Sequence, residues 1–161
     1  MPALTVAGME ISRFEGNLDR ATDEVFSTMM GVHCEPVVDG AGLEREAISA
    51  VIGLAGAMSG SMVLHSGRQV AMRMAERLTG AAPKEVDATV RDAAGELCNM
   101  LAGAWKSLDP VMCSGCMLST PTVIAGSSFE VFSQRAPIRI ERSYQFESMT
   151  FTVTIFCEPQ S

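Results

Sequence analysis

The sequence of 161 residues predicts an α+β fold, in which a mixed or antiparallel sheet has long helices packed on one side. Three segments, near residues 17–30, 66–79 and 87–108, carry apolar residues at the three-to-four-residue spacing of an amphipathic helix. The segments between and after them carry alternating or β-branched apolar residues, which are typical of strands. The resulting order of helix, strands, helix, helix and strands indicates one sheet covered by helices.

The composition indicates one globular domain spanning residues 1–161. Hydrophobic residues make up 47% of the chain and charged residues 19%, which fits a packed core. The formal net charge of −7 argues against nucleic acid or an anionic membrane as a partner. No apolar run approaches the roughly 20 residues of a membrane span, and the N-terminus lacks the features of a secretory signal, so we expect a cytoplasmic protein.

The first helix is expected to start at Asn17, which can cap it, and to end at about Met30 before Gly31. Residues 1–15 are expected to form a loosely packed arm or a short strand. Residues 33–39 are expected to form a short strand after the helix. The buried stripe of the helix is expected to contain Leu18, Ala21, Val25, Phe26 and Met29.

A β-hairpin is expected at residues 47–66, because apolar residues alternate along both of its arms. Its tip is rich in glycine, but no Lys-Ser or Lys-Thr pair follows, so a phosphate-binding loop is not indicated. The next helix is expected to open with a capping box from Ser66 to Gln69 and to run to about Thr79, followed by Gly80.

The segment from Asp87 to Leu108 is expected to form an amphipathic helix around which the chain is organised. On its polar face Glu96 and Asn99 are three residues apart and should project side by side. Small residues beside them would let another surface approach closely, although acidic and amide residues also occur on any solvated helix face. The apolar stripe contains Val90, Ala94, Leu97, Leu101, Ala104 and Leu108, and the polar stripe contains Asp92, Glu96, Asn99, Gly103 and Lys106.

Four further strands are expected at residues 111–118, 122–124, 137–146 and 149–156, from their β-branched content or their alternation. In the third of these strands isoleucines alternate with charged residues, so one of its faces should be in contact with water.

The five cysteines, an odd number placed largely within apolar patterns, suit a reducing compartment. Cys98 and Cys157 are expected to be small buried hydrophobic residues. Cys113 and Cys116 form a C-x-x-C motif, which leaves a zinc or redox site as an alternative. A zinc site would need a second ligand pair, and the available one is far away in the sequence.

The spacing Asp92-x-x-x-Glu96-x-x-Asn99, followed by small residues and by Pro121 opening the segment PTVIAG, resembles the signature of the CheC/CheX/FliY family of chemotaxis phosphatases. The resemblance covers most of the chain. It implies an α+β fold with a pseudo-twofold internal repeat, in which two long helices hold equivalent places.

The first of those helices contains no Glu-x-x-Asn pattern, since Glu24-x-x-Ser27 lacks the carboxamide. This difference indicates the CheX-like branch of the family, which has a single site.

The resemblance implies hydrolysis of the aspartyl phosphate on a CheY-type response-regulator receiver domain. Asn99 would orient the hydrolytic water, and Glu96 would pair with a lysine of the receiver. Asp92 and Pro121 would have supporting roles. The receiver would supply its own Mg²⁺, so this chain is expected to need no cofactor of its own.

The resemblance also implies a homodimer that pairs sheet edges, and residues 138–140 and 151–155 have little edge protection. The alternative to a phosphatase is a receiver-binding adaptor, or a scaffold like the flagellar-switch proteins, which would use the same helix face without hydrolysis.

Overall fold

The computed structural model describes residues 5–6, 9–38, 46–127 and 138–159. Within these residues one antiparallel sheet has the strand order β3-β8-β9-β5-β4, and both β6 and β7 pair with the outer side of β4. A separate pair of short strands, β1 and β2, precedes the first helix. The strands are β1 (Thr5–Val6), β2 (Met9–Glu10), β3 (Glu35–Val37), β4 (Glu46–Gly56), β5 (Met58–Gly67), β6 (Cys116–Leu118), β7 (Thr122–Ser127), β8 (Ile138–Phe146) and β9 (Met149–Pro159).

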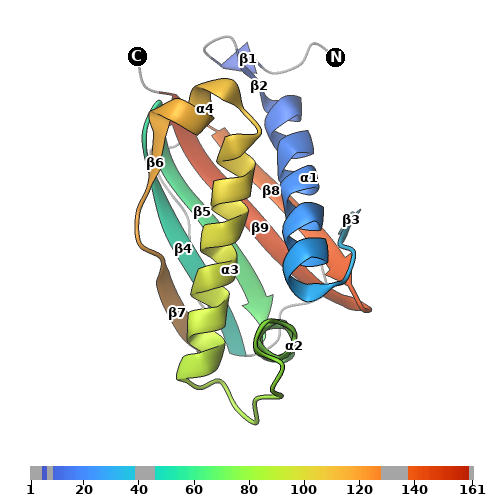
Figure 1. Cartoon of the computed structure of the whole chain (residues 1–161). Helices are drawn as coiled ribbons and strands as arrows, with labels where there is room; N and C mark the ends of the chain where they lie inside the picture. Colours follow the sequence, from blue (N-terminus) through green and yellow to red (C-terminus); the bar gives the residue numbers. More distant parts are fainter. Residues whose placement is uncertain (1–4, 7–8, 39–45, 128–137, 160–161) are drawn as a thin grey trace.

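The helices cover one face of this sheet (Figure 1). The two long ones, α1 (Ile11–Met30) and α3 (Ala88–Ser107), lie side by side across it, while α2 (Arg68–Thr79) lies near one end and the short α4 (Pro110–Gly115) follows α3. This arrangement confirms the predicted α+β fold with long helices on one side. None of the helices in the described ranges combines the length and the apolar character that crossing a membrane requires.

The two halves of the chain are related by a pseudo-twofold repeat. In the middle of the sheet β5 pairs with β9, and each is flanked by its hairpin partner, β4 or β8. Each half then lends a strand to the other, because β3 pairs with β8 and β7 pairs with β4. The buried residues of α1 and α3 recur with the same spacing, as Phe14, Leu18, Ala21, Thr22, Val25 and Phe26 in α1, and as Val90, Ala94, Leu97, Cys98, Leu101 and Ala102 in α3.

The first turns of α1 are held by tertiary contacts, and the helix therefore starts at Ile11 and not at the predicted Asn17. Phe14 is buried, and its carbonyl accepts a hydrogen bond from Trp105 Nε1 at 3.1 Å. Arg13 forms an ion pair of 2.7 Å with the buried Asp109. These contacts join the start of α1 to the end of α3, and they are not visible in local sequence patterns.

The end of α1 agrees with the prediction except in one side chain. Gly31 follows the helix with a φ of +68°, a backbone conformation that glycine adopts without strain. Met29, predicted to be buried, is 47% exposed, and Met30 is buried in its place. The predicted strand after the helix is confirmed in part, as β3, and the structure does not describe residue 39 at its end.

The hairpin of β4 and β5 is confirmed, but the capping box predicted at Ser66 is wrong. The strand continues through Ser66, and Gly67 precedes α2 without a side-chain hydrogen bond to the helix. The predicted end of α2 is confirmed, because Gly80 has a φ of +80° and its N–H donates to Glu76.

The strand predicted at residues 111–118 is mostly a helix. Asp109 accepts hydrogen bonds from Val111 N at 2.9 Å and Met112 N at 3.1 Å, and Pro110 occupies the first turn. An aspartate cap followed by proline is a strong helix start. Here this start outweighs the β-branched content that favoured a strand, and only Cys116–Leu118 remain extended.

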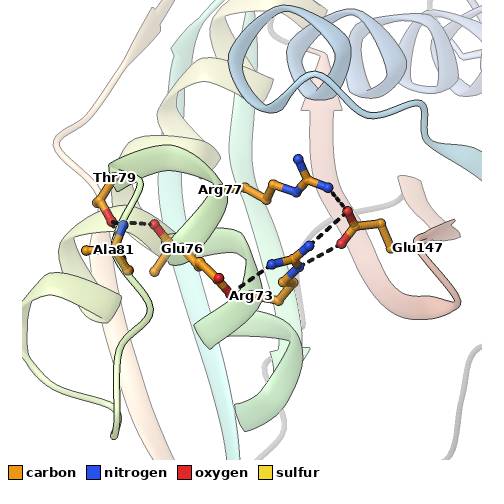
Figure 2. A network of polar contacts seen from close by, with 7 residues as sticks. Arg73, Glu76, Arg77, Thr79, Ala81 and Glu147 are labelled. Carbon is orange, nitrogen blue, oxygen red and sulfur yellow. Dashed lines mark hydrogen bonds and ion pairs between the residues drawn. The ribbon is translucent and has the colours of Figure 1, made fainter.

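An ion-pair network fastens α2 to the turn between β8 and β9 (Figure 2). Glu147 pairs with Arg73, at 2.7 Å, and with Arg77, while Arg73 also pairs with Glu76 at 2.9 Å. Glu147 and Ser148 both have positive φ, at 49° and 68°, as the two-residue turn of a tight hairpin requires. The arginines therefore hold a glutamate whose backbone conformation is unusual for a residue other than glycine.

Candidate active site

The long helix α3 presents the predicted site residues on its solvent side. Asp87 caps the helix, accepting a hydrogen bond from Val90 N at 3.1 Å. The apolar side of the helix packs on the sheet and on α1, and residues such as Leu97 and Leu101 have no exposed surface. Burial of one side fixes the opposite side toward solvent, so Asp92, Glu96 and Asn99 are exposed.

Glu96 and Asn99 form an open pair of side chains. They lie three residues apart, about 4.5 Å along the helix axis, and Asp92 lies one turn before Glu96. In the part of the chain that the structure describes, no side chain forms a hydrogen bond or an ion pair with any of these three. Their polar atoms are therefore available to a molecule outside the chain.

Pro121 is brought against α3 by a glycine. A Cβ atom placed on Gly95 would lie 3.6 Å from Pro121 Cγ and 3.3 Å from Val123 Cγ2. Gly95 is buried, and it precedes Asn99 by one turn of the helix. Pro121, for which the resemblance implies a supporting role, thus lies against the helical turn that precedes Asn99.

The segment that carries Pro121 is fixed on its other side to β4. Ser119 Oγ accepts a hydrogen bond from Gly53 N at 2.7 Å, and Ser119 N donates to Gly53 O at 2.9 Å. Sequence analysis did not single out Ser119. A hydroxyl residue just before Thr-Pro was the available signal, because such residues often bond to backbone at turns.

Lys106, the last member of the polar stripe, is turned toward the sheet edge. It is half-buried, and its Nζ donates to the carbonyl of Cys116 at 2.5 Å. The lysine thus ties the end of α3 to β6, and its ammonium group does not face Asn99 across the stripe.

The helix α1 does not repeat the site. When the buried residues of the two long helices are superposed in order, Arg20 and Asp23 occupy the positions of Glu96 and Asn99. The carboxylate of Asp23 contacts His33 Nδ1 at 3.2 Å and accepts from Cys34 N at 3.0 Å. The predicted single Glu-x-x-Asn pair therefore agrees with the geometry of both helices.

The C-x-x-C motif is divided between two environments. Cys113 is exposed on α4, whereas Cys116 is buried at its end, and burial raises the pKa of the Cys116 thiol. Burial also raises the pKa of Cys98 and of Cys157 to about 12, so these thiols stay protonated at neutral pH. The described residues include no cluster of three or more His, Cys, Asp or Glu side chains placed to hold a metal ion.

A serine–histidine contact lies on the opposite face of the sheet. Ser49 Oγ and His65 Nδ1 are 2.6 Å apart, and burial lowers the pKa of His65. Ser49 has no exposed surface, so its hydroxyl cannot reach a substrate. The contact joins β4 to β5 and is structural.

A family model described as chemotaxis phosphatase CheX matches residues 48–142, more than half of the chain. The chain belongs to the CheX family. The matched range contains Asp92, Glu96, Asn99 and Pro121, and the family description supports a hydrolase role in general. No curated protein sequence matches the chain.

Solved structures of CheX proteins share the fold. CheX from Desulfovibrio desulfuricans is 25% identical with a TM-score of 0.76, and the match covers 91% of this chain and 99% of that one. CheX from Vibrio vulnificus is 22% identical with a TM-score of 0.77, and the match covers 90% of this chain and 96% of that one. The chain is also similar to a protein in the CheX–CheY–BeF₃–Mg²⁺ complex from Borrelia burgdorferi, at 17% identity and a TM-score of 0.70, with 90% and 97% covered.

Proposed function

We propose that this chain hydrolyses the aspartyl phosphate of a CheY-type response-regulator receiver, in which Asn99 of α3 orients the hydrolytic water and Glu96 pairs with a lysine of the receiver. The observation that carries the proposal is the exposed Glu96–Asn99 pair, free of partners in the described chain, in a member of a chemotaxis phosphatase family. The complex of CheX with CheY from Borrelia burgdorferi supports a receiver as the partner.

Asn99 is the residue that orients water. In the reaction the oxygen of water bonds to phosphorus, and the bond from phosphorus to the aspartate oxygen breaks, which releases phosphate and a carboxylate. The carboxamide accepts a hydrogen bond from this water through its oxygen and donates one through its nitrogen. Because the group is neutral, it adds no repulsive charge beside the phosphoryl oxygens.

Glu96 is the residue that positions the receiver. Its carboxylate, one turn from Asn99, can pair with a lysine of the receiver, and such a charge-assisted bond is strong when water is excluded from it. The receiver then brings its phosphoryl group toward Asn99 in a fixed register. We assign the Mg²⁺ to the receiver, and no cofactor of this chain takes part.

Asp92 and Pro121 support the pair from either side. Asp92 lies in the N-terminal half of α3, where a negative charge interacts favourably with the helix dipole. Pro121 lies against Gly95 and, with Ser119 fixed to β4, limits the sideways movement of the helix turn before Asn99.

The decisive experiment compares Asn99→Ala with wild type on a panel of phosphorylated CheY-type receivers. Loss of one positioned hydrogen bond should lower the rate at saturating protein by about 10² to 10³. Affinity for a receiver loaded with beryllofluoride and Mg²⁺, and the melting temperature, should change little, because the side chain is exposed.

Asn17→Ala is the matched control, since it removes a carboxamide from the other long helix and should leave the rate unchanged. A folded Asn99→Ala variant that works at the wild-type rate would show that the site is wrong. A wild-type protein that binds these receivers without hydrolysing them would instead be an adaptor or a scaffold.

A further inference from the structure

Gly103 lies one helical turn beyond Asn99 on the same solvent-facing stripe of α3. A Cβ atom placed there would meet no atom within 4 Å, so the chain itself makes no use of the missing side chain. Glycine inside a helix is less favourable than alanine by about 1 kcal/mol. The described fold gains no packing contact that offsets this loss.

The other glycine within α3, Gly95, is explained by packing inside the chain. Gly95 is buried, and a methyl group there would press on Val123, at 3.3 Å, and lie in ordinary contact with Pro121. Its bare backbone is filled from inside the chain, by β7. At Gly103 no described atom occupies the place of the missing side chain.

Two polar side chains near Gly103 are held by bonds within the chain, and Gly103 itself is half-buried. Ser107 Oγ is folded back onto Gly103 O at 2.7 Å, and Lys106 is tied to the carbonyl of Cys116. Met100 is half-buried and packs on the core. The place of the missing side chain is therefore open, about 6 Å along the helix axis from Asn99 and in the direction of α4.

We propose that Gly103 is a contact point for the receiver, where a surface segment of the partner packs directly against the backbone of α3. This inference rests on the proposed function, because it takes the phosphorylated receiver as the occupant. A partner that engages Glu96 and Asn99 together must lie along this stripe, and its surface passes over the next turn at Gly103. Close contact there lets the phosphoryl group reach the short carboxamide side chain.

The position therefore determines which partners fit. A methyl group at residue 103 would point into the space of the bound receiver and would overpack the contact. The same methyl group would strengthen the free helix. Stability and receiver binding should change in opposite directions, which a merely structural glycine would not produce.

The test compares Gly103→Ala with Gly16→Ala. Gly16 lies inside the other long helix, α1, and also has no atom within 4 Å of a built Cβ, although it is exposed where Gly103 is half-buried. Both variants should melt about 2 to 4 °C higher than wild type. The probe for binding is a CheY-type receiver domain loaded with beryllofluoride and Mg²⁺, and the probe for catalysis is the same domain phosphorylated.

We expect Gly103→Ala to bind the loaded receiver about 5- to 100-fold more weakly, with Gly103→Met weaker still. Its rate at saturating receiver should fall much less than its affinity, and Gly16→Ala should match wild type in both. A Gly103→Ala variant with wild-type affinity would overturn the inference. If wild type binds the receiver but does not hydrolyse its phosphate, the phosphatase proposal fails while the affinity comparison still decides the role of Gly103; if no receiver binds, both fail.

Discussion

At the scale of single residues, the polar side chains of the two long helices differ in whether the fold uses them. Asp19 of α1 accepts hydrogen bonds from Arg142 Nε at 3.0 Å and from the Tyr144 hydroxyl at 2.7 Å, and it therefore holds α1 to β8. Glu96 and Asn99 have no such partner among the described residues. The stability of the fold gains little from these two side chains, so we expect their identity to be determined by the molecule that binds there.

The first prediction at this scale concerns Glu96. Replacing it with alanine should weaken binding of a beryllofluoride-loaded receiver at least about tenfold, because one partner of an intermolecular ion pair is lost. The loss should shrink as salt is raised, since salt screens the wild-type pair. Binding titrations at two ionic strengths check this.

Glu85→Gln is the control, because this exposed acid lies just before α3 and outside the polar stripe. If Glu96→Ala binds the receiver as tightly as wild type at low salt, Glu96 is not part of the contact. If both variants lose affinity equally, the effect comes from the overall charge.

At the scale of elements, the sequence predicts those parts whose causes are local. The periodicity of α3 spans its length, so its buried side and its exposed Asp92, Glu96 and Asn99 could be predicted, whereas Lys106 at the end of the polar stripe is half-buried. The start of α1 could not, because Phe14 is held by Trp105, far along the chain. The helix α4 had a local signal in Asp109 and Pro110, and the competing strand pattern obscured it. The closeness of Pro121 to Gly95 depends on how β7 pairs with β4, which no local pattern encodes.

A second prediction concerns the joint between α2 and the β8–β9 turn. The arginines around Glu147 lower the pKa of its carboxyl group, so the folded state favours the charged form. The stabilisation is present above the ordinary glutamate pKa, near 4.5, and is lost as the pH falls through the lowered value. Glu147→Gln should therefore melt about 1 to 3 °C below wild type at pH 7, a small effect because the network is solvent-exposed.

The difference in melting temperature should close as the pH is lowered below 4. Glu24→Gln, at an exposed acid of α1 with no ion pair in the described chain, should show no difference at either pH. If the melting temperature of Glu147→Gln is still below that of wild type at pH 3, the effect comes from the turn conformation and not from the ion pairs.

At the scale of the whole molecule, the observed strand order corrects the prediction of which sheet edge a second copy of the chain could pair with. β9 lies between β8 and β5, so residues 151–155 are not an edge, contrary to the sequence interpretation. Among the described residues, β3 pairs with β8 at Ser143, Tyr144 and Gln145. The β3 edge contains a proline and a glutamate, whereas β7 contains neither and pairs in the described chain with β4 alone.

The third prediction is that the protein is a homodimer in solution, formed through a sheet edge with both Asn99 surfaces left free. Light scattering at micromolar concentration should give twice the mass of one chain. Val123→Lys and Ala125→Lys test the β7 edge, and Glu35→Lys on β3 is the control. A wild-type monomer would contradict the dimer, and a dimer that survives both β7 changes would place the contact elsewhere.

The exchange of outer strands between the two halves has a consequence for how the site is maintained. Pro121 and Ser119 belong by sequence to the half that carries α3, but they are anchored on β4, a strand of the half that has no site. The halves are interlocked, so neither can unfold, be replaced or diverge as a separate module while the other keeps its shape. Under the proposed function, we expect substitutions that loosen the first half to act on the α3 turn before Asn99 through this anchor, and to lower turnover without any contact to the receiver.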